Sequence, residues 1–239
     1  VDQQYAREAL DLLSIWDGQI GVASAPATVF ELFIAEITKT IAKIKAPNSA
    51  EWSMGKSSTI VKPYTLLVAR RTSHTTRLLK EQPADWFDKS WNTIIQKALV
   101  ETIRILRIRY GNDHKNWAWG NVRQLILRHP FGERKMFSHI FNRGPFPLGG
   151  DANSISQAAA PLDNPTGNPL SIPSMRMVID IGEWENSRFS IPGGQSGNPM
   201  SPHYDDLLPL WIRGEGVPIP WGRESVLQGM ESNLELRPE

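Results

Sequence analysis

The sequence predicts an α+β protein with a helical first half and antiparallel strands in its second half. Before Pro130, apolar residues recur at three- and four-residue spacing through long stretches, which indicates amphipathic helices. After Pro130, short alternating segments are separated by Gly, Pro, Asn and Ser, which is typical of strands and loops. We therefore expect a mainly helical region over residues 1–129 and a strand-rich region with a short helix over residues 130–239.

The first two helices are predicted from apolar spacing and from their end signals. The first is expected to stop at Asp17-Gly18, and its apolar positions are Ala6, Ala9, Leu10, Leu13 and Trp16. The second is expected to begin at Ser24 with Pro26 just inside its start. Its expected apolar face consists of Val29, Phe30, Phe33, Ile34, Ile37, Ile41 and Ile44. Its polar residues are expected to lie largely elsewhere on the helix: Glu31, Glu36, Lys39 and Lys43.

A third helix is predicted from about Ser90 to Tyr110, with Gly111 as its C-terminal cap. The positions in register are Trp91, Ile95, Ala98, Thr102, Leu106 and Tyr110. Three arginines on this helix are interpreted as a solvated face: Arg104, Arg107 and Arg109. Residues 47–89 give a weaker helical or irregular pattern, which Pro63 and Pro83 interrupt. The segment 110–117 is interpreted as a helix end and a connection.

Four segments of the second half are expected to form strands or strand-like pieces: ERKMFSHIF, ANSISQAA, MRMVIDIG and SRFSIPG. In MRMVIDIG, residues 175–182, alternation places Met177 and Ile179 on one face and Asp180 on the other. We expect both faces to be covered, with Asp180 paired or hydrogen-bonded, because an unpaired buried carboxylate is costly. Residues 161–174 contain four prolines and are expected to form a long exposed excursion. A short helix within residues 202–215 and an extended segment over 217–221 are expected to follow.

Composition excludes some kinds of site and gives no reason to expect others. The 239 residues carry a net charge of +1, which offers no general electrostatic attraction to nucleic acid or to an anionic membrane. The absence of cysteine excludes disulfides, thiol nucleophiles and thiolate metal sites. No apolar run approaches the roughly 20 residues of a membrane span. Since Val1 is not an initiator methionine and the chain opens directly into a helical pattern, we expect a piece of a longer polypeptide.

The loop 191–206 groups a serine, a histidine and two aspartates. Around Ser196 the sequence reads Gly-Gln-Ser-Gly-Asn, so the second glycine comes one position too early for a nucleophile elbow. We interpret this stretch as a Gly/Pro-rich loop, and an independent serine hydrolase using Ser196, His203 and an aspartate stays the minor alternative. No metal site is expected, because the other histidines are scattered and form no HExxH motif: His74, His114, His129 and His139.

Four phrases in order resemble the penicillin acylase (penicillin amidase) family: ALDLLSIWDG, ALVETIRILRIRYGNDHKNWAWG, FPLGGDANSISQAA and the long stretch from PSMRMVIDIG to GVPIPW. The resemblance spans about Ala6 to Trp221. It implies an N-terminal nucleophile hydrolase with an αββα sandwich, whose precursor cleaves itself into α and β chains. The new N-terminal serine then attacks an amide, with its own α-amine as the base. An asparagine side chain and a backbone amide stabilise the oxyanion.

The resemblance places this chain in the C-terminal part of the β chain, as one fragment of a larger domain. The nucleophile and the oxyanion asparagine are then expected upstream, so no catalytic residue is expected here. Gln195, Ser196, His203 and Asp180 are at most supports of the pocket. The family's calcium site is also expected upstream, so we expect no cofactor or metal in this chain.

The partners that the resemblance implies are the α chain, the upstream β segment and a small N-acyl substrate such as a β-lactam or an acyl-homoserine lactone. Neither nucleic acid nor a membrane span is expected, and the location implied is periplasmic or secreted. By itself the chain is expected to hydrolyse no amide. The alternative is a non-catalytic structural or interaction fragment.

Overall fold

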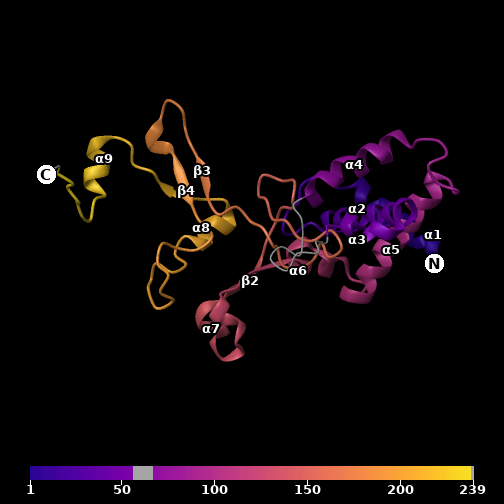
Figure 1. The fold of residues 1–239 in the computed structure, drawn as a ribbon, viewed down its shortest axis with the longest axis horizontal. Helices are drawn as coiled ribbons and strands as arrows, with labels where there is room; N and C mark the ends of the chain where they lie inside the picture. The colour runs from indigo at the N-terminus through magenta and orange to yellow at the C-terminus, as the bar shows by residue number, and fades with distance from the viewer. Residues whose placement is uncertain (56–66, 238–239) are drawn as a thin grey trace. The chain divides into compact units, whose positions relative to one another are not determined.

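The structure is a computed structural model that describes residues 1–55 and 67–237, so the expectation concerning Pro63 lies outside the described residues. The chain forms two compact units, Val1–Ile172 and Pro173–Glu239, and each is described by itself (Figure 1). The chain is thus mixed helix and strand, as predicted. Among the described helices, none has the length and apolar character needed to cross a membrane.

The first unit contains most of the helices. Its α-helices are α1 (Asp2–Ser14), α2 (Ala25–Lys45), α3 (Ala50–Ser53), α4 (Leu67–Glu81), α5 (Trp91–Tyr110), α6 (Trp119–Val122) and α7 (Ser138–Phe141). Its short 3-10 helices are η1 (Pro47–Ser49), η2 (His114–Trp117), η3 (Pro130–Glu133) and η4 (Lys135–Phe137). Helices α1, α2 and α5 pack together around a core cluster of Ala9, Val29, Leu32, Leu99, Ile103, Leu106 and Trp117.

The predicted ends of α2 and α5 are confirmed. Ser24 Oγ accepts a hydrogen bond from the amide of Ala27 at 3.2 Å, and Ser90 Oγ accepts one from Thr93 at 3.3 Å. Each hydroxyl satisfies a backbone donor that has no partner within its helix. Gly111 follows α5 with φ of 78°, a conformation that favours glycine.

Some side chains of the three helices differ from the expected faces. Leu10 and Ile44, both predicted on apolar faces, are exposed. Arg107 was expected on a solvated face but pairs with the partly buried Glu8, with 2.8 Å between Nη2 and Oε2. His114 contacts the other oxygen of Glu8, also at 2.8 Å. The pairing with Arg107 follows from helix packing, because α1 lies against α5 and brings Glu8 within reach of the guanidinium.

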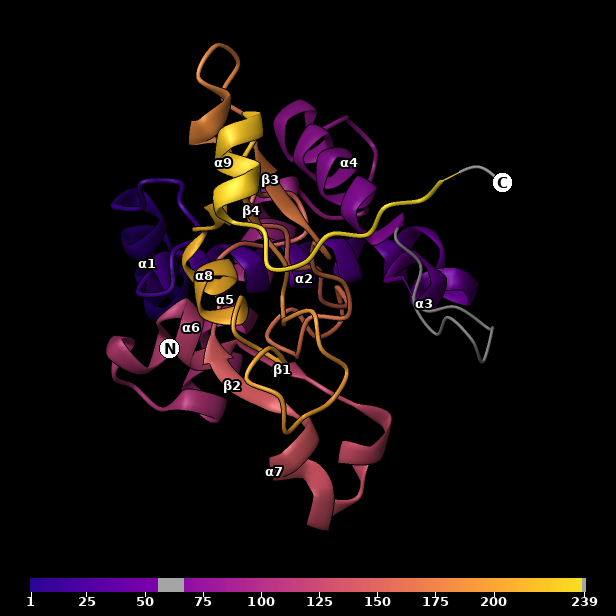
Figure 2. The same cartoon turned by 90° about the vertical axis from the view of Figure 1, so that its left-hand side faces the viewer.

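A two-stranded antiparallel sheet in the first unit joins β1 (Gln124–Leu127) to β2 (Arg143–Pro147). Gln124 lies opposite Pro147, and Leu125 lies opposite Phe146. Figure 2 shows α7 in the connection between these strands. The expectation that ERKMFSHIF is a strand is therefore wrong.

The segment instead forms η4 and α7, in which aromatic rings pack on one another. The rings of His129 and Phe141 are stacked with their centroids 4.8 Å apart, and those of Phe137 and Phe141 lie edge to face at 6.4 Å. Phe137 and Phe141 are four residues apart, which places them on one side of a helical turn. Local ring packing thus accounts for the helical conformation.

Two further expectations for the first unit are wrong. ANSISQAA contains bends rather than a strand, apart from an isolated bridge between Ala159 and Ser171. The excursion over 161–174 is not broadly exposed, because its buried residues include Pro161, Leu162, Pro165 and Pro169. Leu162 packs in a cluster with Ala35 and Met54. Tertiary contacts to α2 therefore draw this proline-rich segment inward.

The second unit contains a three-stranded antiparallel sheet in the order β3-β4-β5, formed by β3 (Arg176–Val178), β4 (Arg188–Ser190) and β5 (Val217–Pro218). Its helices are η5 (Trp184–Asn186), α8 (Leu208–Arg213) and α9 (Arg223–Gln228). The predicted strands within MRMVIDIG and SRFSIPG, the short helix and the closing extended segment are confirmed, although each is shorter than its sequence pattern.

Apolar side chains on and beside β3 are exposed, whereas Arg176 is half-buried against the Trp211 ring. Met177 is 52% exposed, and Met175, Val178 and Ile181 are exposed as well. Asp180 is also exposed rather than buried, although Asn186 Nδ2 donates a hydrogen bond to its Oδ2 at 3.2 Å. Coverage of both faces in a longer protein stays a prediction.

Candidate functional site

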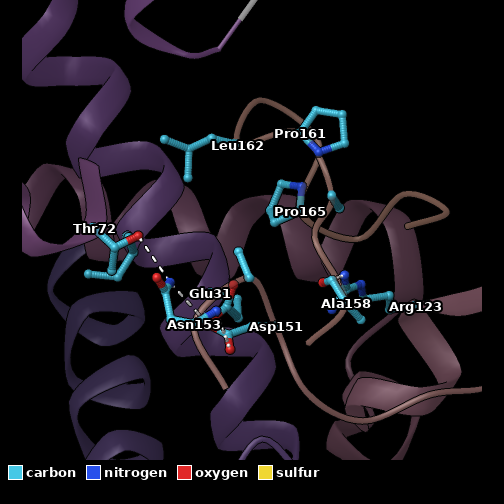
Figure 3. Close-up of a pocket in the computed structure, with 12 residues that line it drawn as sticks. Glu31, Thr72, Arg123, Asp151, Asn153, Ala158, Pro161, Leu162 and Pro165 are labelled. Carbon is cyan, nitrogen blue, oxygen red and sulfur yellow. Dashed lines mark hydrogen bonds between the residues drawn. The ribbon is translucent and has the colours of Figure 1, made fainter. Parts of the chain in front are cut away.

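Three charged residues from distant parts of the first unit meet in its interior, and we call Glu31, Arg123 and Asp151 the carboxyl–arginine cluster (Figure 3). Glu31 lies in the middle of α2. Arg123 lies between α6 and β1, and Asp151 lies in the loop that follows β2. Because a helix, the α6–β1 connection and the loop after β2 each supply one member, only the folded chain assembles this cluster.

Arg123 is 1% exposed and is held mainly by backbone carbonyls. Its Nη1 donates to Gly150 O at 2.6 Å, and its Nη2 donates to Ala158 O. The guanidinium carbon lies 5.0 Å from the centre of the Trp119 ring. Burial lowers the pKa of Arg123 to about 10, although the charges of Glu31 and Asp151 act in the opposite direction. Its Nε is buried and has no hydrogen-bond partner in the part of the chain that the structure describes.

Asp151 organises the loop after β2 through its own side chain. Its Oδ1 accepts hydrogen bonds from the amides of Asn153 at 3.0 Å and Ser154 at 2.7 Å. These bonds replace ladder pairing, which explains why ANSISQAA turns instead of forming a strand. Gly150 has φ of 77°, and a Cβ there would meet Ser156 O at 1.9 Å. Glycine is therefore required next to Asp151.

Glu31 is partly buried, and burial is the main reason that its pKa rises to about 8. The charge of Asp151 and a side-chain hydrogen bond with Asp151 raise this pKa further, whereas Arg123 lowers it. Two carboxyl groups close together favour a state in which they share one proton. The cluster therefore brings a carboxyl group with a raised pKa next to a second carboxyl group and a buried guanidinium.

The expectation that Glu31 lies away from the buried face of α2 is wrong. Ala27 and Thr28, four and three residues before it, are buried, and so are Ile34 and Ala35, three and four residues after it. Residues at these spacings share a helix face with Glu31. The helical periodicity thus carried a signal that could have placed this carboxyl group inside.

The cavity beside the cluster has a volume of about 30 Å³, which exceeds the roughly 10–15 Å³ that one water molecule needs. Asn153 connects it to α4, because its Nδ2 donates to Thr72 Oγ1 at 3.5 Å (Figure 3). The residues that line the cavity are Glu31, Ile34, Thr72, Arg123, Asp151, Ala152, Asn153, Ala158, Ala160, Pro161, Leu162 and Pro165. A cavity of this size is too small to hold an N-acyl substrate.

Ser196, in the second unit, takes part in a hydrogen-bonded turn. Its amide donates to His203 O at 3.0 Å, and its Oγ accepts from the amide of Asn198 at 3.2 Å. Gly194 is required here, because a Cβ at this position would lie 2.0 Å from His203 O. Gln195 is exposed beside this turn. The structure therefore brings Ser196 and His203 together through the backbone.

The imidazole of His203 is 70% exposed on its side chain and faces Asp206, with 2.8 Å between Nδ1 and Oδ2. The hydrogen bond and then the charge of Asp206 raise the pKa of His203. Asp180 instead contacts the segment after η5, where its amide donates to Ser187 Oγ at 3.2 Å. The supporting roles of Gln195, Ser196, His203 and Asp180 stay predictions. Among the described residues, no group of three or more His, Asp or Glu is placed to hold a metal ion.

Comparisons with known proteins find relatives that are named as acylases. Acyl-homoserine lactone acylase QuiP of Pseudomonas fluorescens (strain Pf0-1) is 28% identical over 228 residues, which cover 92% of this chain and 26% of that protein. Penicillin acylase 2 proenzyme of Pseudomonas sp. (strain SE83) is 26% identical over 238 residues, which cover 98% of this chain and 29% of that protein. The chain thus spans about a quarter of the length of the curated relatives that it matches.

A solved structure of thermostable penicillin G acylase from Alcaligenes faecalis aligns with all of this chain and 44% of that chain, at 17% identity and a TM-score of 0.48. That similarity is too low to establish a shared fold. The family model described as Penicillin amidase matches residues 2–228. On that match, the chain belongs to the penicillin amidase family.

Proposed function

We propose that this chain is the C-terminal β-chain portion of an amidohydrolase that cleaves the amide of N-acylated substrates, such as β-lactams or acyl-homoserine lactones. The observation that carries the proposal is the family match over residues 2–228. Relatives named as an acyl-homoserine lactone acylase and a penicillin acylase support the same reaction class. Because the chain spans about a quarter of these relatives, the activity would belong to a longer protein.

The proposed nucleophile is an N-terminal serine upstream of these residues. An α-amine has an ordinary pKa near 8 (about 7.7–8.0), so it can act as the base for the hydroxyl of the same residue. The turn around Ser196 supports this assignment, because its hydroxyl accepts from Asn198 while the imidazole of His203 faces Asp206. Neither side chain is arranged as a nucleophile with its base. The loop would then support the pocket without attacking the substrate.

The second unit supports the proposal that further chain segments complete it. Its buried hydrophobic residues, among those described, are Leu208 and Trp211. Its exposed large apolar residues are Met175, Met177, Val178, Ile181, Trp184, Met200, Trp221, Val226, Leu227, Met230, Leu234 and Leu236. A unit of this size with so small a core gains little stability from its own burial. We propose that the α chain and the upstream β segment cover part of this surface.

Two further properties belong to the same proposal. The location would be periplasmic or secreted, as the family resemblance implies, and fractionation of cells that express the full-length protein tests this. The calcium site would be formed by upstream residues. Calcium titration of the full-length protein, followed by calorimetry, should then give the same affinity after substitution of Asp180 or Asp206 by asparagine.

The central experiment compares serine variants of the full-length protein with a chromogenic phenylacetyl or long-chain acyl anilide. Substituting the serine at the upstream processing site with alanine should abolish turnover, by about 1,000-fold or more. Ser196→Ala should change turnover by no more than a few-fold. Ser201→Ala is the matched control, because Ser201 lies in the same loop and its Oγ also accepts a backbone hydrogen bond, from His203 at 3.2 Å.

Three results would contradict the proposal. A loss of about 1,000-fold in folded Ser196→Ala, with Ser201→Ala unaffected, would support the independent serine hydrolase. Absence of turnover by the processed wild-type protein on any N-acyl anilide would favour a structural or interaction role. Turnover by the 239-residue chain alone would also contradict it, because we expect the chain without the upstream nucleophile to be inactive.

A further inference from the structure

The charges of the carboxyl–arginine cluster do not balance if both carboxyl groups are ionised. Glu31 and Asp151 would then carry two negative charges beside the single positive charge of Arg123 in a largely buried region. An excess charge away from water is costly, and one proton on the pair removes it. Neutrality thus favours a protonated carboxyl group.

Hydrogen bonding indicates which of the two carboxyl groups holds that proton. Oδ1 of Asp151 already accepts two backbone amides, from Asn153 and Ser154, and its Oδ2 accepts Asn153 Nδ2 at 3.4 Å. All three donors need an accepting oxygen, so Asp151 acts as the acceptor within this cluster. The terminal nitrogens of Arg123 donate to carbonyl oxygens. Glu31, on the apolar side of α2, is therefore the group that retains a proton.

We propose that Glu31 keeps its proton in the folded protein at neutral pH and donates it to Asp151, so that one buried proton latches the loop after β2 to helix α2. The latched part of the loop runs from Asp151 to Ala158. Both the amide and the carbonyl of Ala158 make hydrogen bonds within the cluster. The amide of Ala158 donates to Asp151 O at 2.7 Å, and its carbonyl accepts from Arg123. The latch thus joins α2, Arg123 and the loop through consecutive contacts.

The charged groups that face Glu31 are Arg123 and Asp151, and they come from two different connections between elements. Arg123 follows α6, and Asp151 follows β2. The other described residues that line the cavity from α2, α4 and the loop have no titratable side chain: Ile34, Thr72, Ala152, Asn153, Ala158, Ala160, Pro161, Leu162 and Pro165. Raising the pH above about 8 should remove the proton and release the loop.

Infrared difference spectroscopy of the full-length protein tests where the proton lies. At neutral pH, the wild type should show the carbonyl stretch of a protonated carboxylic acid, and Glu31→Gln should lack it. Glu36→Gln is the matched control, because Glu36 lies on the same helix and pairs with Lys39, with 3.1 Å between Oε1 and Nζ. That variant should keep the band. An unchanged band in folded Glu31→Gln would overturn the assignment.

Hydrogen exchange tests the latch itself. In the wild type and in Glu36→Gln, protection factors of the amides of Ser154 and Ala158 should fall about tenfold or more between neutral pH and two units above the pKa of Glu31. They should stay constant in Glu31→Gln. Protection that is independent of pH in the wild type, or the same fall in Glu31→Gln, would refute the latch.

A second variant keeps the test decisive if Glu31→Gln does not fold. In Asp151→Asn the negative charge that raises the proton affinity of Glu31 is removed, while a side-chain oxygen that can accept hydrogen bonds remains. The protonated-acid band should then titrate at a lower pH than in the wild type. A band with the same midpoint in both proteins would show that Glu31 and Asp151 are not coupled.

Discussion

In the first unit, α1, α2 and α5 enclose a core that contains Val29, Ile103 and Trp117, whereas the buried hydrophobic residues described in the second unit are Leu208 and Trp211. The second unit has ordered strands and helices but leaves apolar side chains on its surface. Hydrogen bonding and turn geometry can therefore define a local fold without supplying much burial. Its stability must depend more on what covers it.

The two units also differ in where their charges lie. The first unit buries Arg123 beside two carboxyl groups. Burial raises the pKa of one of them, Glu31, so the ionisation of Glu31 is coupled to folding. In the second unit, His203 with Asp206 and Arg213 with Glu215 lie in solvent, where water and salt screen their interaction. We therefore expect pH to affect the stability of the first unit more strongly.

The largest expected effect tests whether the first unit depends on its own core. Leu106→Ala removes a fully buried side chain and should lower the free energy of unfolding of the full-length protein by about 2–5 kcal/mol. Ile108→Ala on the same helix removes an exposed side chain and should change it by about 0.5 kcal/mol or less. Chemical denaturation measures both. Equal effects would show that α5 packs differently from the structure.

The next expected effect concerns pH. Because the pKa of Glu31 is about 8 in the folded protein and has an ordinary value of 4.5, the folded state binds a proton that the unfolded state releases between these values. Stability should therefore fall as pH rises through this window, by at most about 1.4 kcal/mol per pH unit. Denaturation across this range should show a flatter profile for Glu31→Gln. If the free energy of unfolding of the wild type does not change with pH, the two units do not differ in how pH affects their stability.

A somewhat smaller effect tests whether the second unit is covered in the longer protein. Met177→Asp should destabilise the full-length protein by about 3 kcal/mol if another segment covers β3, because it would bury an unpaired carboxylate. Met200→Asp is the control, since it replaces an exposed methionine in a loop of the same unit. Thermal denaturation measures the difference. If both variants melt like the wild type, the apolar face of β3 is open to solvent and the contrast extends to the full-length protein.

The smallest effect sharpens the comparison at the level of local structure. Ser24→Ala removes the acceptor for the amide of Ala27 at the start of α2 and should cost about 1 kcal/mol. Ser24→Asp should retain most of this stability, because aspartate also caps helices well. If Ser24→Ala is as stable as the wild type, tertiary packing rather than the cap fixes the start of α2.

The candidate sites differ in how far the sequence predicted them. The glycines and prolines of residues 191–206 predict a loop, and Gly194 does lie where a side chain would collide with His203 O. The carboxyl–arginine cluster was not predicted, because no spacing along the chain indicates that Glu31, Arg123 and Asp151 meet. Such a cluster depends on the packing of a helix, a strand connection and a loop.

The sequence by itself determined the helix starts at Ser24 and Ser90 and the end at Gly111, because caps act between residues that are neighbours in the chain. It also determined the family, through residues 2–228. Only the tertiary structure decided that Arg123 and Asp151 meet Glu31 and that Pro161 and Leu162 are buried. Those outcomes depend on contacts between segments far apart in sequence, whose energies outweigh the local preference of a carboxylate or a proline-rich loop for solvent.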